Sequence, residues 1–175
     1  MSKVKELPSL YGENLYVPFV GAIIERTGKD GSKEILVQTR VKKTDRLYSG
    51  SIEIPGGKMR AFEDIYQTIR REVKEESGLD ITFIQHEETR IDYPNKEDVS
   101  SLIEPFCVTQ MQNGPFIGLI FLCRATGNTL QSSDETENVR WINIHKLNEI
   151  VQNHPEKVYT AFLAPLQKYL QIHCQ

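Results

Sequence analysis

Apolar residues fall into short runs along the chain, and these runs predict the strands of a sheet. They are rich in β-branched and aromatic residues, and turn-forming residues separate them. The segments 28–32 (GKDGS) and 113–115 (NGP) have the composition of hairpin turns. We expect polar loops at 96–101 and 127–138 and strands at 15–26, 34–40, 51–54, 81–93, 102–112, 116–126 and 139–144.

A second period, of three and four residues, predicts helices. In residues 62–77 it is carried by Phe62, Ile65, Ile69 and Val73, and Gly78 supplies a stop signal. A short helix is expected at 145–153. A terminal helix should begin near Pro155, with a kink or split at Pro165 and an apolar face of Val158, Phe162, Leu166 and Leu170.

These elements predict one α/β domain. Strands flanked by helices on both faces form an α/β/α sandwich around a mixed sheet. The first 14 residues are polar and broken by Pro8 and Gly12, so we expect them to form a surface arm. The remaining residues, 15–175, are enough for a single domain with a substantial core.

The helix predicted at 62–77 carries glutamates in unusual places. On a helical wheel, Glu76 lies within the apolar sector, Glu72 lies just beyond its edge, and Glu75 lies further round. Carboxylates beside a buried face are costly unless a counter-charge meets them, which suggests a bound cation. The alternative is an ordinary solvated face whose glutamates pair with Arg70, Arg71 and Lys74.

The spacing of residues 57–79 decides between these interpretations. Five residues separate Gly57 from Glu63, seven more lead to Arg71, and the segment then reads REVKEESGL. In this pattern the chain resembles the Nudix hydrolases, including the MutT-like members, because it matches the Nudix box at every specified position. Many family members have glycine immediately before the first glutamate, where this chain has Phe62.

The resemblance implies a metal site and a fold. It implies the α/β/α sandwich already expected, and that Glu72, Glu75, Glu76 and the Gly57 carbonyl bind Mg²⁺ or Mn²⁺. Hard oxygen ligands of this kind suit either ion. By the same analogy, Arg71 should orient the cluster by pairing with carboxylates.

The resemblance leaves the general base open. Glu63 is among the carboxylates expected to pair with Arg71. A box glutamate, Glu76 or Glu75, competes for the role of base with Glu135 and Glu137 of the acidic loop. A base must lie within reach of the attacking water, and the sequence alone does not show reach.

A basic segment lies between the second and third predicted strands. Arg40 and Arg46 are our candidates for binding substrate phosphates, since guanidinium groups pair with phosphoryl oxygens. The alternative is a solvated charged loop. Tyr48, Tyr93 and Phe116 are candidates to stack on a nucleobase, with packing as the alternative.

Composition excludes other classes of function. A formal net charge of −3 lacks the basic excess of nucleic-acid-binding domains. The longest apolar runs, 17–24 and 116–123, are too short to span a bilayer, and no apolar signal core follows the first lysines. Three cysteines without CxxC spacing fit a reducing compartment, so we expect a cytoplasmic protein.

The resemblance implies a reaction, namely the attack of water on the diphosphate linkage of a nucleoside diphosphate derivative. The expected partner is therefore a small nucleotide: a nucleoside triphosphate, a nucleotide sugar such as ADP-ribose, or a dinucleotide. Homodimers are common in the family, so a homodimer is possible. The alternative is a catalytically silent nucleotide-binding or regulatory module, a type that tends to lose the metal glutamates.

Overall fold

The computed structural model describes residues 7–41, 47–130, 133 and 135–174. Its helices are α1 (Ile65–Ser77), α2 (Ile144–Asn153) and α3 (Thr160–His173), and none in the described ranges is both long and apolar enough to cross a membrane. The strands are β1 (Ser9–Leu10), β2 (Glu13–Asn14), β3 (Val17–Thr27), β4 (Lys33–Arg40), β5 (Ile52–Glu53), β6 (Gly56–Lys58), β7 (Asp80–Ile84), β8 (Ile91–Asn95), β9 (Asp98–Leu102), β10 (Cys107–Gln110), β11 (Phe116–Thr126) and β12 (Thr136–Asn143).

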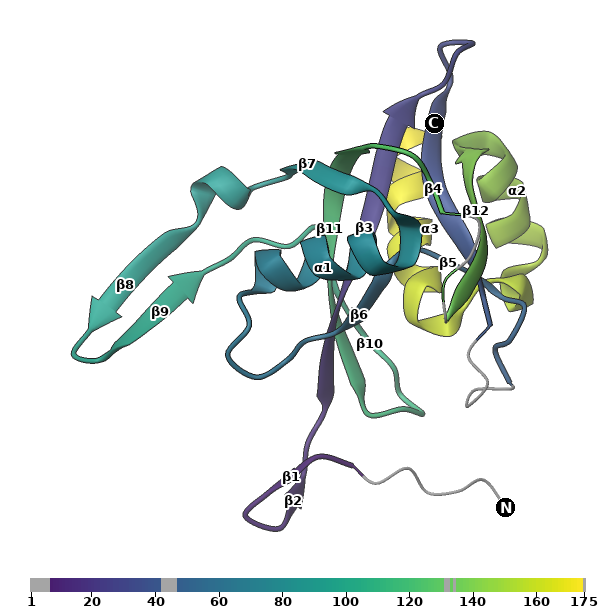
Figure 1. The fold of residues 1–175 in the computed structure, drawn as a ribbon. Coiled ribbons are helices and arrows are strands. Elements are labelled where there is room, and N and C mark those ends of the chain that lie inside the picture. The colour runs from purple at the N-terminus through teal and green to yellow at the C-terminus, as the bar shows by residue number, and fades with distance from the viewer. Residues whose placement is uncertain (1–6, 42–46, 131–132, 134, 175) are drawn as a thin grey trace.

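The main sheet is mixed, and its central strands lie in the order β10-β11-β3-β4-β12 (Figure 1). Strands β11 and β3 are parallel, whereas the pairs β10–β11, β3–β4 and β4–β12 are antiparallel. The hairpins predicted around the turns at 28–32 and 113–115 are both present, as β3–β4 and β10–β11. Three short strands extend the sheet, and one of them, β6, pairs with β3 so that Gly57 lies opposite Val20.

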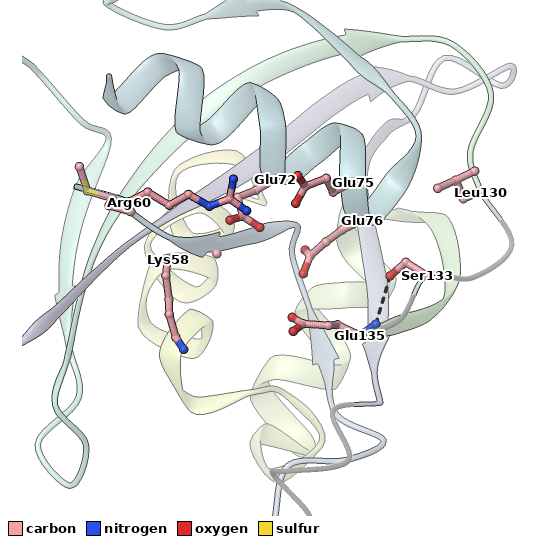
Figure 2. Close-up of a pocket in the computed structure, with 10 residues that line it drawn as sticks. Lys58, Arg60, Glu72, Glu75, Glu76, Leu130, Ser133 and Glu135 are labelled. Carbon is pink, nitrogen blue, oxygen red and sulfur yellow. Dashed lines mark hydrogen bonds between the residues drawn. The ribbon is translucent and has the colours of Figure 1, made fainter. Parts of the chain in front are cut away.

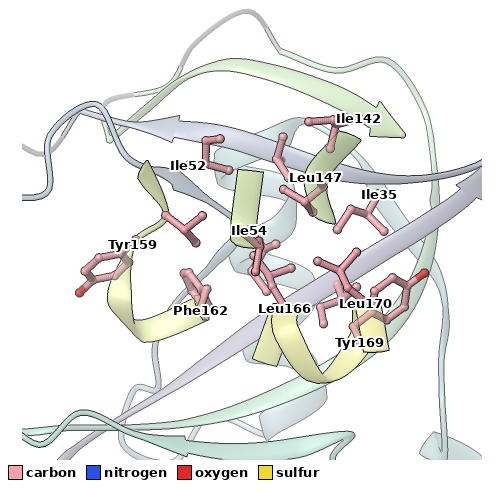
Figure 3. Close-up of a cluster of buried hydrophobic side chains, with 14 of the residues drawn as sticks. Ile35, Ile52, Ile54, Ile142, Leu147, Tyr159, Phe162, Leu166, Tyr169 and Leu170 are labelled. Atoms are coloured by element: carbon pink, nitrogen blue, oxygen red, sulfur yellow. The ribbon is translucent and has the colours of Figure 1, made fainter. Parts of the chain in front are cut away.

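Strand β3 separates two hydrophobic cores. Successive side chains of a strand point to opposite faces, so Phe19 and Ile23 belong to the core under α2 and α3, while Val20 and Ile24 belong to the core under α1. Figure 3 shows the first of these cores, in which side chains of α2 and α3 meet those of β4, β5 and β12. The predicted α/β/α sandwich is confirmed.

The prediction was wrong for residues 81–101. The single strand expected at 81–93 is divided into β7, a 3₁₀ turn at Glu87–Thr89 and β8, and the loop expected at 96–101 contains β9. Strands β8 and β9 pair with each other in a hairpin that projects from the body of the molecule (Figure 1). Nearly all their residues are exposed, so no alternation of apolar and polar residues marks them.

Other boundaries shift by several residues. The strand expected at 102–112 is reduced to β10, and β12 begins inside the expected acidic loop. Pro155 begins a 3₁₀ turn at Pro155–Lys157 rather than the terminal helix, and Pro165 lies within α3, which runs without a break. Strands β1 and β2 form a small exposed hairpin; the division into an arm of residues 1–14 and a domain of 15–175 stays a prediction.

Helix α1 begins three residues later than expected. Asp64 caps its start, because Oδ1 accepts hydrogen bonds from the backbone N–H groups of Tyr66 (2.9 Å) and Gln67 (3.2 Å). Phe62 therefore lies outside the helix, fully exposed, with a φ of 65° in the left-handed region. Glycine adopts this conformation most easily, which gives a physical reason for the glycine that many Nudix proteins have here. Gly78 ends the helix as predicted, with a φ of 79°.

Replacing Gly78 with alanine should lower the free energy of unfolding by about 1–2 kcal/mol, because a side chain at positive φ is strained. Its Cβ would also lie 2.7 Å from Leu130 Cγ and 3.0 Å from the Asn128 carbonyl oxygen. Urea unfolding followed by circular dichroism measures the change. The control is Phe62→Gly, which relieves a strained exposed residue and should stay within about 1 kcal/mol of the wild type. Equal losses in both variants would contradict this account.

Candidate active site

One cleft, of about 830 Å³, brings together Gly57 and three glutamates of the box (Figure 2). Its walls come from β6 and the loop after it, from the last two turns of α1, and from the segment before β12. It is lined by Gly57, Lys58, Met59, Arg60, Glu72, Glu75, Glu76, Leu130, Ser133 and Glu135.

The three glutamates of α1 differ in exposure as the helical wheel predicted. Glu76 is buried with 6% of its surface exposed, because it lies on the apolar face of the helix. The side chain of Glu72 is 14% exposed, and that of Glu75 is 54% exposed. Of the three α1 carboxylates, one therefore lies at the floor of the cleft and two lie nearer its mouth.

The buried Glu76 carboxylate is held from two directions. Its Oε2 accepts a hydrogen bond of 2.7 Å from Gln38 Nε2 on β4 and one of 2.9 Å from the Gly56 backbone N–H on β6. Hydrogen bonds to a charged acceptor are stronger than those between neutral groups. These contacts connect β4, β6 and α1 through a single side chain.

A second buried acidic residue, which the sequence reasoning missed, contacts the same Gln38 nitrogen as Glu76. Glu53 is 3% exposed and pairs with Arg40 at 3.0 Å. Arg40 is itself buried, and its guanidinium carbon lies 4.3 Å from the centre of the Tyr159 ring. The structure thus gives Arg40 a buried carboxylate partner, and its predicted contact with substrate stays a prediction. Arg46, the other candidate, lies outside the described residues.

Arg71 binds several carboxylates at once. Its Nε and Nη2 donate to the two oxygens of Glu63 at 2.7 and 2.8 Å, and its Nη1 donates to Glu72 at 2.5 Å and to Glu75 at 3.3 Å. The expected pairing of Arg71 with carboxylates, Glu63 among them, is confirmed. The hydrogen bonds from Arg71 lower the pKa of Glu63 to about 2, and the Glu63 carboxylate raises the pKa of Arg71.

Gly57 allows α1 to approach β6 closely, and Gly56 allows β6 to approach β3. A Cβ on Gly57 would lie 2.2 Å from Glu72 Oε2, so the Glu72 carboxylate fills the space that any other residue would need. A Cβ on Gly56 would lie 2.3 Å from the backbone oxygen of Val20. The two glycines of the turn are therefore required for different contacts.

The donor set of the cleft fits a hard divalent cation. Carboxylates and a backbone carbonyl are ligands that Mg²⁺ and Mn²⁺ prefer, and the cradle beside Gly57 admits the Glu72 carboxylate. Among the described residues, no three acidic, histidine or cysteine side chains are already gathered in a geometry that could hold an ion. In this arrangement Arg71 donates to one oxygen of Glu72 and to one oxygen of Glu75.

The two acidic residues of the later loop are placed differently. Glu135 lines the cleft, and Figure 2 shows its side chain on the same side as Glu76. Its carbonyl oxygen accepts a hydrogen bond from the Val41 N–H at 2.9 Å. Glu137 lies on β12 opposite Thr39, is exposed, and is not among the residues that line the cleft.

Two exposed cations of the cleft were also missed by the sequence reasoning. Lys58 and Arg60 lie on its wall, and both stand inside the box within three residues of Gly57, a position that could have indicated them (Figure 2). Gln38 and Glu53 could have been found from a different signal. Each is a polar residue within a buried strand, the first in the strand of Leu36 and the second in that of Ile52.

A second cavity, of about 700 Å³, lies between the β10–β11 turn and the start of α3. Tyr48, Phe116 and Tyr159 line it, together with amide side chains such as Gln110 and Asn113. Two of the three predicted stacking residues, Tyr48 and Phe116, are thus in one cavity. Tyr93 is not, because it lies on the projecting strand β8.

Comparison with known proteins gives a consistent assignment. A family model of the NUDIX domain matches residues 16–162, whereas no curated protein sequence matches the chain significantly. A Nudix hydrolase from Nitrosomonas europaea has a TM-score of 0.66 at 18% identity, over 93% of this chain and 74% of that one. The Nudix domain of Shewanella oneidensis NrtR, in complex with ADP ribose, has a TM-score of 0.64 at 12% identity, over 96% and 94%.

A MutT protein from Methanosarcina mazei Go1 has a TM-score of 0.58 at 19% identity, over 95% of this chain and 100% of that one. At such identities the structural likeness establishes the fold alone. The family model, however, spans most of the sequence and includes the whole box. The chain therefore belongs to the Nudix family.

Proposed function

We propose that this protein hydrolyses a diphosphate linkage in a nucleoside diphosphate derivative and depends on a divalent metal ion. The observation that carries the proposal is the gathering of Gly57, Glu72, Glu75 and Glu76 around one cleft. The substrate classes are a nucleoside triphosphate, a nucleotide sugar such as ADP-ribose, or a dinucleotide. The complex of the NrtR Nudix domain with ADP ribose supports the compatibility of the fold with such a ligand.

Glu72, Glu75, Glu76 and the Gly57 carbonyl would hold Mg²⁺ or Mn²⁺. The bound ion would polarise the phosphoryl group, acidify the attacking water and stabilise the leaving oxygen. In the absence of the ion, Arg71 keeps the carboxylates of Glu72 and Glu75 near one another. Glu63 in turn holds Arg71 through two hydrogen bonds, and it acts as a positioning residue.

The proton acceptor for water is one of the carboxylates that line the cleft. Of the four candidates for this role, Glu76, Glu75 and Glu135 line the cleft and Glu137 does not. A base must lie within hydrogen-bonding reach of the water it deprotonates, which favours the lining residues. The choice among the three stays open.

Cationic side chains of the cleft would bind the substrate phosphates. Lys58 and Arg60 are exposed on its wall and suit this role, because their charges are accessible to phosphoryl oxygens. Arg40 and Arg46 stay predicted contributors. Tyr48 and Phe116, in the second cavity, are candidates to stack on the base.

The alternative is a nucleotide-binding or regulatory module without catalysis. The retention of all three metal glutamates in the cleft favours the enzyme. The metal ion, the substrate and the cytoplasmic location all belong to the proposal. A homodimer is possible in addition.

We expect hydrolysis that requires Mg²⁺ or Mn²⁺ and stops on addition of EDTA. The screen should include nucleoside triphosphates, ADP-ribose, nucleotide sugars, dinucleoside polyphosphates and coenzymes, with phosphate detection. Glu76→Gln should lower kcat/KM by about a hundredfold or more, because removing even an indirect partner of a metal ligand costs 10–100-fold. Circular dichroism should show that the variant stays folded.

The control is Glu149→Gln, an exposed glutamate on α2, which should retain wild-type activity. Full activity of Glu76→Gln would reject the role of Glu76. Binding of nucleotides without hydrolysis of any compound would favour the silent module.

Gly57→Ala should fold but lose activity and Mn²⁺ affinity about tenfold or more, because its Cβ would displace the Glu72 carboxylate, a ligand. Glu72 is a flexible side chain that can move away, so the unfolding midpoint should change little. In Gly56→Ala the clash is with the backbone of Val20, and this variant should lose stability instead. Kinetics and thermal unfolding of both variants test the contrast, and wild-type kinetics in Gly57→Ala would contradict it.

The Glu63–Arg71 pair should make stability depend on pH. The pKa of Glu63 falls from 4.5 to about 2 on folding, so its contribution is fully present above pH 4.5 and is lost as the pH falls through about 2. The difference in free energy of unfolding between the wild type and Glu63→Gln should therefore be largest above pH 4.5 and shrink below it. Urea titrations across this range measure it, and a difference that does not vary with pH would refute the assignment.

A further inference from the structure

Gln38 lies on β4, outside the box, and has no exposed surface. Its Nε2 atom faces two carboxylates, at 2.7 Å from Glu76 Oε2 and 3.4 Å from Glu53 Oε1. Its Oε1 atom is buried and makes no hydrogen bond within the part of the chain that the structure describes. Gln38 is therefore a neutral donor placed between two buried acids.

The orientation of this amide follows from its neighbours. The NH₂ group has two hydrogens, so it can donate to both glutamates, whereas the amide oxygen can only accept. Turning the amide over would set its oxygen against two carboxylates. The orientation that serves the glutamates is thus the one that leaves Oε1 buried and without a partner.

That arrangement is costly for stability. A buried acceptor without a hydrogen bond costs about 1–3 kcal/mol, and an apolar side chain of similar length would avoid this cost. A lysine at this place would bond the glutamates but would also neutralise the charge of Glu76. A glutamine fixes the carboxylate and leaves its negative charge available to a cation.

We propose that Gln38 is a positioning residue for Glu76. It holds Oε2 from the side of the sheet while the Gly56 N–H holds the same atom from the turn, so the carboxylate keeps one orientation at the floor of the cleft. Glu53, paired with Arg40 at 3.0 Å, receives the second and longer contact of the amide. The inference rests on the proposed function, because it takes Glu76 to be a metal ligand.

The test is Mn²⁺ binding to the purified protein without nucleotide, measured by electron paramagnetic resonance of free Mn²⁺. Gln38→Met keeps the length of the side chain and removes both donors, and it should bind Mn²⁺ about tenfold more weakly. The control is Val151→Ala, which opens the core under α2, on the face of the sheet opposite α1. Val151→Ala should lower the thermal midpoint but bind Mn²⁺ as the wild type does.

A double-mutant cycle with Glu76→Gln separates positioning from a general loss of stability. If Gln38 acts through Glu76, then Gln38→Met should have no further effect on Mn²⁺ binding in the Glu76→Gln background. Wild-type Mn²⁺ affinity in Gln38→Met, or an equal loss in both backgrounds, would overturn the inference alone. A wild-type protein that binds no Mn²⁺ would overturn both the proposed function and this inference.

Discussion

The burial of one carboxylate sets the arrangement of this site. Glu76 lies on the apolar face of α1, and an ionised carboxylate loses several kcal/mol of hydration when it is buried. Charge-assisted hydrogen bonds from Gln38 and the Gly56 N–H offset this loss, at about 1.5–3 kcal/mol each. These donors come from β4 and β6. The carboxylate of Glu76 can therefore be buried with its hydrogen bonds formed only when both strands are in place.

A second constraint acts nearer the mouth of the cleft. Arg71 is one guanidinium among the carboxylates of Glu63, Glu72 and Glu75, so it cannot neutralise all three. Like charges at such short range repel one another unless further cations reach them. The cleft thus combines an excess of negative charge with Lys58 and Arg60 on its wall. This charge pattern suits a divalent cation at the carboxylates and an anionic group beside the two cations.

The sequence predicted those parts of the molecule in which burial gives the sequence a periodic pattern of apolar and polar residues. The exposures of Glu72, Glu75 and Glu76 follow the helical wheel, and the alternation along β3 separates the two cores. The exposed hairpin of β8 and β9 has no such pattern, so it was predicted as part strand and part loop. Gln38 and Glu53 were missed because their contacts join β4, β5 and α1, and no local pattern encodes which strand ends lie beside a helix.

The spacing of the box can be understood as helix geometry. Asp64 caps α1, and Arg71 lies seven residues further on, about two turns along the same side. Helical side chains point back toward the N-terminus, so Arg71 reaches Glu63 just before the cap, while Glu72 and Glu76 lie one turn apart. The intervals between the motif positions are therefore fixed by distances, whereas the residues within them are not. That difference also explains how Phe62 can occupy a position where glycine is the easier residue.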